Sequence, residues 1–169
     1  MNIILLIIFI FAITFAYAGI RGAPWAPTKK ADVPRFLELA NIKPGDRVYD
    51  LGCGDGRLLF AAAEKGAEVI GYEISLLPYV IAKFKQFSFV KKEKTRILFK
   101  DFWNVNLADA DLVYFFLMPK IYAKLKNKFE KELKPGSRII AYVWPIEGWT
   151  PVKVSTLENA QKIYLYEIK

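Results

Sequence analysis

The fold of this 169-residue chain is decided by the stretch YDLGCGDGRLLF, Tyr49–Phe60. Residues 50–56 of this stretch include three glycines and two aspartates, and apolar runs lie on both sides. Arg47–Leu51 is expected to form a strand, and residues 57–65 a helix that Gly66 ends. A glycine loop between a strand and a helix is the place where open α/β sheets bind ligands.

The rest of the chain continues this alternation of strands and helices. Asp32 is expected to cap a helix with its apolar face on Val33, Phe36, Leu37 and Ala40. Further strands are expected at 68–74, 96–101, 111–117 and 137–144, helices at 77–87 and 121–133, and a closing hairpin from 152–157 and 162–168. Such alternation predicts a three-layer α/β fold whose sheet is mainly parallel.

Composition excludes several kinds of chemistry. The chain has no histidine, which excludes Ser-His-Asp triads and histidine-ligated metals. Cys53 is the single cysteine, so neither an intramolecular disulfide nor a cysteine cluster for zinc can form. We therefore expect no metal site. Chemistry must rely on carboxylates, lysines, aromatic rings, backbone groups or a cofactor.

The N-terminus differs from the rest of the chain. Asn2–Ile20 carries no charge, and its 19 residues would form a helix of about 28 Å, close to the thickness of a bilayer core. The sequence AYA at 16–18 also fits the cleavage site of a secretory signal peptide. We favour an uncleaved anchor over residues 1–20, because Arg21, Lys29 and Lys30 follow the apolar run and place the C-terminal side of the anchor in the cytoplasm. Residues 21–31 then form a linker or lid, and residues 32–169 one domain.

A formal charge of +8 suggests an anionic partner, although a solvated surface explains it equally well. The stretch KFKQFSFVKKEK, Lys83–Lys94, interleaves lysines with aromatic residues and suits either an anionic lipid surface or one solvated helix face. Nucleic acid is a weaker interpretation, because arginine is scarce and no RNA-binding motif is evident.

The acidic residues around the loop indicate the ligand. A dinucleotide site requires the spacing G-x-G-x-x-G, but here the third glycine comes one residue early and Arg57 takes its place. Asp50 and Asp55 would repel a diphosphate. Glu73 ends the second strand, where a carboxylate accepts hydrogen bonds from ribose hydroxyls; alone, this also fits NAD. Asp101 ends the third strand. Acids at successive strand ends suit a sulfonium cofactor that bears an amino acid and a nucleoside.

These motifs carry a resemblance to a known family. With VYDLGCGDGR as its cofactor motif, the chain resembles class I S-adenosylmethionine-dependent methyltransferases. The segments APWAPT, KPGDRVYDLGCGDGR, VIGYEI and KDFWNVNLADADLVYFFLMP resemble the membrane-anchored lysine methyltransferases of the adenine nucleotide translocase and the ATP synthase c subunit. The resemblance implies a Rossmann-like, seven-stranded sheet with an antiparallel last strand.

The resemblance also implies roles for individual residues. The methionine part of the cofactor would lie against Asp50, Gly52, Gly54, Asp55 and Gly56. Glu73 would hold the ribose, and Asp101 with Phe102 the adenine. Cys53 stands where serine or alanine is common in such loops, and it is interpreted as structural.

The acceptor site is expected at the ends of strands four and five. Pro119 and Trp144 are candidates for its walls, and Thr28, with Trp25 and Pro27, for a lid. No general base is assigned. The preferred function is methylation of a lysine in a membrane protein, with the bilayer as a second partner. The alternatives are methylation of a lipid or quinone-like molecule, and a non-catalytic cofactor-binding module. The sequence leaves the oligomeric state open.

Overall fold

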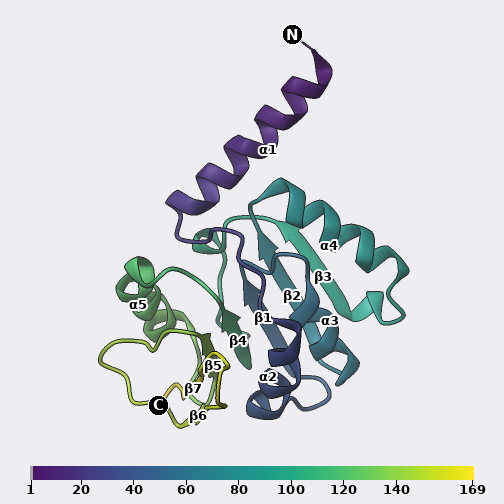
Figure 1. Cartoon of the computed structure of the whole chain (residues 1–169). Coiled ribbons are helices and arrows are strands. Elements are labelled where there is room, and N and C mark those ends of the chain that lie inside the picture. Colours follow the sequence, from purple (N-terminus) through teal and green to yellow (C-terminus); the bar gives the residue numbers. More distant parts are fainter. Residues whose placement is uncertain (1) are drawn as a thin grey trace.

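The computed structural model describes residues 2–169 and contains a seven-stranded sheet flanked by helices (Figure 1). The strand order is β3-β2-β1-β4-β5-β7-β6. The strands are β1 (Arg47–Leu51), β2 (Glu68–Glu73), β3 (Thr95–Phe99), β4 (Leu112–Phe115), β5 (Arg138–Tyr142), β6 (Lys153–Ser155) and β7 (Ile163–Glu167). The helices are α1 (Ile3–Ile20), α2 (Val33–Ala40), α3 (Arg57–Glu64), α4 (Leu76–Ser88) and α5 (Tyr122–Glu132). Short 3₁₀ turns are η1 (Lys30–Asp32), η2 (Lys92–Lys94), η3 (Phe102–Asn104) and η4 (Pro119–Ile121).

Neighbouring strands from β3 to β5 run parallel, and β7 returns antiparallel between β5 and β6. This confirms the predicted mainly parallel sheet with a C-terminal antiparallel hairpin. The strand order reverses beside β1, because β2 pairs with one of its edges and β4 with the other. A crevice forms at such a switch point, at the carboxyl ends of the strands.

Two apolar layers cover the sheet. The strands alternate their side chains, so Val48 of β1 packs with α2, α3 and α4, while Tyr49 faces the side that α5 covers. Phe36 of α2, Leu59 of α3 and Phe129 of α5 are each buried against the sheet. These layers hold the carboxyl ends of β1, β2 and β4 in fixed positions beneath α1.

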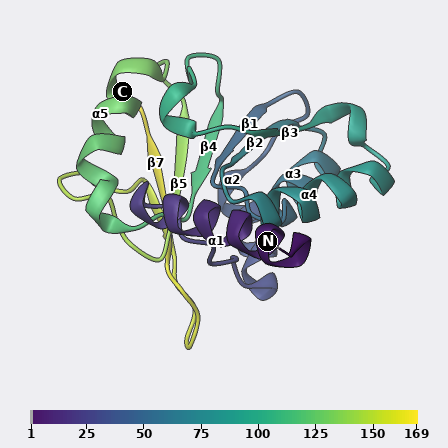
Figure 2. The same cartoon turned by 90° about the horizontal axis from the view of Figure 1, so that it is seen from above.

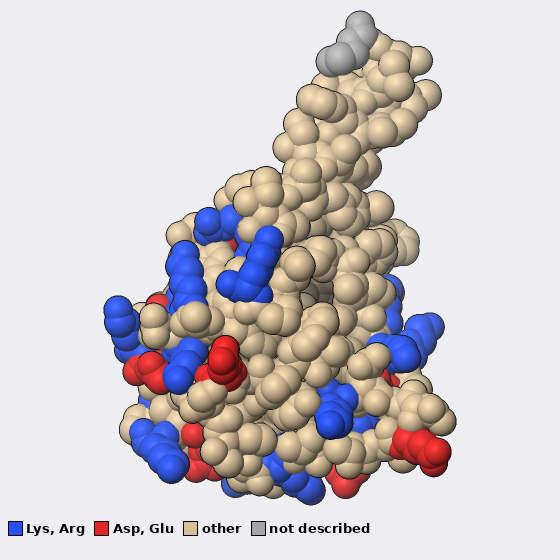
Figure 3. Space-filling model, turned by 60° about the vertical axis from the view of Figure 1, so that its left-hand side comes forward, with Lys and Arg blue, Asp and Glu red and all other residues tan. Residues whose placement is uncertain are grey.

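Helix α1 rises from the edge of the sheet at which the parallel strands end (Figure 1), and from above it crosses over the sheet between α5 and α4 (Figure 2). It is long and apolar enough to cross a membrane, a test that a signal sequence also passes. Most of its side chains are exposed, and it stands out as a column without charge in Figure 3. Its lower part nonetheless contacts the domain: Ala18 is buried, and Leu76 N donates to Thr14 Oγ1 at 3.2 Å.

Two local expectations differ from the structure. Asp32 precedes α2, but its buried carboxylate accepts hydrogen bonds from Arg35 and the Tyr142 hydroxyl instead of capping the helix. A charged guanidinium is the stronger partner for a buried carboxylate. Helix α4 forms as predicted, but Phe84 and Phe87 on its apolar stripe are 79% and 82% exposed and face away from the sheet.

Candidate functional site

The glycine loop connects the end of β1 to the start of α3. Gly52, Gly54 and Gly56 all have positive φ values, of 89°, 55° and 77°, which other residues adopt only with strain. The backbone N–H groups of Gly52 and Cys53 donate to the carbonyl oxygen of Tyr72 on β2, at 2.9 and 3.0 Å. The loop is therefore fixed against the neighbouring strand and turns its backbone toward the crevice.

Glu73, the last residue of β2, joins this loop to the start of α4. Its Oε2 accepts from Gly54 N at 2.8 Å, and its Oε1 accepts from Ile74 N at 2.9 Å and Ser75 N at 2.7 Å. Burial raises the pKa of Glu73, and the three backbone donors only partly oppose this effect. The sequence predicted a ligand-binding role for Glu73, but the structure also shows it organising the loop.

Asp50 lies beside Glu73 and is 3% exposed. Its Oδ1 has no hydrogen-bond partner among residues 2–169, although it lines the cavity at the glycine loop. Burial, followed by the negative charges of Glu73 and Asp55, raises the pKa of Asp50 well above its usual range. An unpaired buried carboxyl oxygen of this kind fits a ligand that brings a positive charge or a hydrogen-bond donor.

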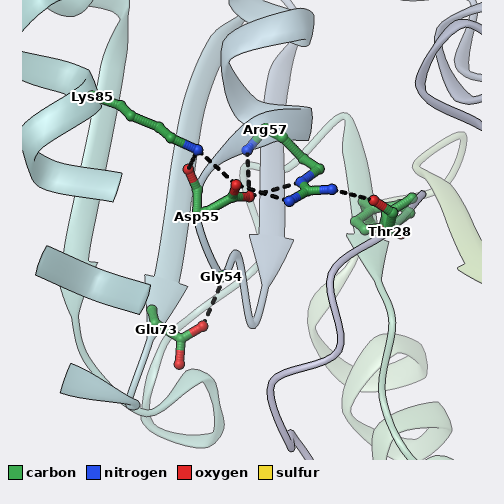
Figure 4. Close-up of polar contacts among 7 residues, drawn as sticks. Thr28, Gly54, Asp55, Arg57, Glu73 and Lys85 are labelled. Carbon is green, nitrogen blue, oxygen red and sulfur yellow. Dashed lines mark hydrogen bonds and ion pairs between the residues drawn. The ribbon is translucent and has the colours of Figure 1, made fainter. Parts of the chain in front are cut away.

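Asp55 sits between two cations, as Figure 4 shows. Arg57 contacts both of its oxygens, at 2.8 and 2.9 Å, and Lys85 Nζ lies 2.6 Å from Oδ2. Burial favours the neutral acid, but these partners prevail and lower the pKa of Asp55 to about 2. Asp55 is thus a paired anion, and no pattern in the sequence indicated its partner Lys85, which comes from α4.

Residues Arg21–Thr28, here called the strap, lie across the glycine loop. Arg57 Nη1 donates to the carbonyl oxygen of Thr28 at 2.6 Å (Figure 4), and the Thr28 hydroxyl lies 2.7 Å from that of Tyr114 on β4. A Cβ on Gly54 would lie 3.2 Å from Nε1 of Trp25. The cavity between strap and loop measures about 30 Å³, the space of roughly one water. The strap therefore closes this part of the crevice.

Asp101 and Phe102, the candidates for the adenine, lie near the first residue of the strap. Asp101 pairs with Arg21, whose Nη2 lies 2.7 Å from Oδ2, and Oδ1 accepts from Trp103 N at 3.0 Å. Phe102 is 2% exposed and belongs to the core. Its ring packs against Trp103 at a centroid distance of 4.9 Å.

At the acceptor end, Trp144 stacks on Phe116 with ring centroids 5.8 Å apart, and Phe116 lines the cavity beneath the strap. Pro119 lies elsewhere, in a groove between α5 and the segment after β5. The structure thus brings Thr28 and the Phe116–Trp144 pair to one place, but not Pro119. Cys53 is buried, which raises the pKa of its thiol and suits a structural role.

Comparisons with known proteins agree with this geometry. The family described as the ANTKMT methyltransferase domain matches residues 50–153. A protein-lysine N-methyltransferase of Saccharolobus islandicus is 35% identical over 152 residues, which cover 86% of this chain and 93% of that protein. The adenine nucleotide translocase lysine N-methyltransferase of Mus musculus is 30% identical over 148 residues, with 86% of this chain and 63% of that protein covered.

Among solved structures, an RNA methyltransferase of Salinibacter ruber in complex with S-adenosyl-L-homocysteine superposes with a TM-score of 0.80 at 29% identity. The match covers 85% of this chain and 94% of that one. The seven-stranded fold and the glycine loop with its acids agree with these matches. The predicted family resemblance is thereby confirmed, and the chain belongs to the ANTKMT methyltransferase domain family.

Proposed function

We propose that this S-adenosylmethionine-dependent protein-lysine methyltransferase is anchored in a membrane and methylates a lysine side chain of a membrane protein. Its family and its 35% identity to a protein-lysine N-methyltransferase support the reaction class. The observation that carries the membrane part is α1, an exposed and uncharged helix that is long and apolar enough to cross a membrane. The Arg21–Asp101 ion pair holds the end of this helix at the carboxyl edge of the sheet.

The donor groups at this edge fit the proposed cofactor. The unpartnered Oδ1 of Asp50 suits the cationic amino-acid end, and the acceptor site that Glu73 keeps beside its three backbone donors suits a ribose hydroxyl. We assign Asp101 to accept from the adenine amino group, with the buried Phe102 directly after it in the chain. Because Arg57 and Lys85 already neutralise Asp55, we assign that residue to shaping the loop. The narrow cavity implies that the strap shifts when the cofactor enters.

The bound cofactor supplies an electrophilic methyl group, so the protein has to position the acceptor and exclude water. A lysine must reach the site as a neutral amine, and apolar surroundings favour that form. The stacked rings of Phe116 and Trp144 offer such surroundings next to the cavity. Their faces also tolerate the methylated ammonium product through cation–π attraction. Thr28 and Tyr114 close this end with their 2.7 Å hydrogen bond.

The contacts of α1 limit where the acceptor can lie. From Thr14 to Arg21 the helix touches the domain, and Ile13 borders a cavity shared with it, which leaves residues 3–10 exposed over a length of about 12 Å. This is shorter than the ~30 Å core of a bilayer. The domain must therefore sit directly against the membrane, with its sheet edge facing the lipid. An acceptor lysine close to the membrane surface would then reach the site.

The test uses membranes from cells that lack the protein, incubated with the purified full-length chain and cofactor labelled on its methyl group. We expect hydrolysed membrane protein to contain labelled methyl-lysine, and Asp50→Ala to abolish the labelling. Glu147→Gln, which removes an exposed carboxylate after β5, is the matched control.

Other fates of the label would contradict parts of the proposal. Label that extracts with organic solvent would favour a lipid or quinone-like acceptor. Label released by ribonuclease would favour RNA, the acceptor class named for the Salinibacter ruber protein. Equal labelling in soluble and membrane proteins would argue against the anchor. A mature N-terminus at Gly19, found by mass spectrometry, would show that α1 is a signal peptide.

A further inference from the structure

A second cavity lies between α1 and the carboxyl ends of β2 and β3. Ile13, Thr14 and Tyr17 of α1 form one side, and the domain forms the other through Ile74, Phe99, Lys100 and Asp101. Its walls are mostly apolar, and its volume is about 330 Å³. This equals the share of about eleven waters in the liquid, enough for an adenine base of about ten heavy atoms.

The position of this cavity indicates which part of the cofactor it suits. Ile74 directly follows Glu73, so a nucleoside with its ribose hydroxyls at Glu73 would extend its base toward this space. The carboxylate of Asp101 at the far wall contacts three nitrogens: Trp103 N at Oδ1, and Nε and Nη2 of Arg21 at Oδ2. A carboxylate has about four acceptor sites, so Asp101 can still accept from an exocyclic amine.

We propose that α1 is a working part of the cofactor site: Ile13 and Tyr17 form the outer wall of the adenine subsite, and Arg21 positions Asp101. This rests on the proposed function, since it takes S-adenosylmethionine as the cofactor. It goes beyond the family match, which begins at residue 50 and does not include α1. The anchor helix thereby links the position of the domain at a membrane to the affinity for its cofactor.

Three contacts argue that α1 docks here in a defined register. Leu76 N donates to Thr14 Oγ1, Phe15 packs on Trp25 of the strap with centroids 6.1 Å apart, and Ala18 is fully buried. Tyr17, in the same segment, is still 47% exposed and borders the cavity. Its ring therefore forms part of the cavity wall and is not packed in the core. Truncating this side chain should change the cavity more than the stability of the fold.

The experiment measures binding of two ligands to the full-length chain in lipid nanodiscs by calorimetry. S-adenosylhomocysteine spans the whole site, whereas 5′-methylthioadenosine lacks the amino-acid part and reports on the adenosine end. We expect Tyr17→Ala to raise the Kd of both ligands about three- to tenfold, the range for a lost aromatic contact. Tyr17→Phe should retain the affinity. Ile7→Ala, which alters an exposed residue nearer the N-terminus of the same helix, should leave both Kd values unchanged.

Failure of this inference is separable from failure of the proposed function. If the wild-type chain binds neither ligand, the assignment of the cofactor is wrong. If it binds both and Tyr17→Ala binds them within twofold of wild type, α1 is not part of the subsite. A lower melting temperature of Tyr17→Ala with unchanged Kd values would likewise overturn the inference, because it would show a purely structural contact.

Discussion

Replacing Asp55 by asparagine should reveal how much the cations around the glycine loop contribute to stability. The pKa of Asp55 is lowered to about 2 from an ordinary value of 3.8. Because one pKa unit corresponds to about 1.4 kcal/mol, the ionised form gains at most about 2.5 kcal/mol in the folded protein. The Lys85 side chain is 44% exposed, so solvent screening reduces this. We expect Asp55→Asn to lower the free energy of unfolding by about 1–2 kcal/mol at pH 7.

The dependence on pH distinguishes this explanation from a simple packing defect. A carboxyl group with a lowered pKa stabilises the fold above its unfolded pKa, and the effect disappears as the pH falls through the folded value. The difference between wild type and Asp55→Asn should therefore be constant above about pH 5 and vanish toward pH 2. Thermal unfolding across this range measures it, with Glu147→Gln as the control. A difference that stays constant down to pH 2 would refute the electrostatic account.

Three further predictions concern the loop and the acceptor end. Gly71→Ala on β2 should lower the free energy of unfolding by about 1–3 kcal/mol in chemical unfolding, because its Cβ would lie 2.2 Å from a methyl group of Leu59 on α3. Gly19→Ala should leave the free energy of unfolding unchanged, because a Cβ at this position would lie in open space. Glu73→Ala should lower the melting temperature as well as weaken S-adenosylhomocysteine binding in calorimetry, because three buried N–H donors lose their acceptor. Trp144→Ala should lower turnover several-fold in a methyl-transfer assay with little change in cofactor Kd, since its ring touches Phe116 and does not line the cofactor cavity.

The elements of the fold could be predicted because their signals are local. Glycines at close spacing after an apolar strand, and acids at the ends of successive strands, mark one edge of a parallel sheet without knowledge of distant contacts. The hairpin of β6 and β7 was predictable for the same reason. Its two apolar runs flank a short polar segment.

The contacts that shape the site could not be predicted, because they join distant parts of the chain. Arg21 and Asp101 lie 80 positions apart in the sequence, and Thr28 and Tyr114 lie 86 positions apart.

The orientation of α4 could not be predicted for another reason. Helical periodicity defines a stripe but does not say which stripe faces the sheet. Here the small residues Pro78 and Ala82 face inward and let the helix approach closely.

The three acids nearest the loop differ in their hydrogen-bond and ion-pair partners, and this difference distinguishes Asp50 from the other two. Asp55 is paired with Arg57 and Lys85, and Glu73 accepts three backbone N–H groups. Only the Asp50 carboxyl, among these three, keeps an oxygen without a partner within residues 2–169, and its pKa is raised by burial and by its acidic neighbours. A cationic ligand beside Asp50 would lower that pKa again, since it favours the charged form.

Binding of the cofactor should therefore release protons at pH values below the raised pKa of Asp50. Below the raised pKa of Asp50, the free protein carries a proton that the complex does not, so affinity should rise with pH and level off above that value. Calorimetry of S-adenosylhomocysteine binding in buffers of different ionisation enthalpy counts the released protons. Asp50→Asn should abolish the release and flatten the pH dependence of Kd. If wild type and Asp50→Asn release the same number of protons at every pH, another group meets the positive charge of the ligand.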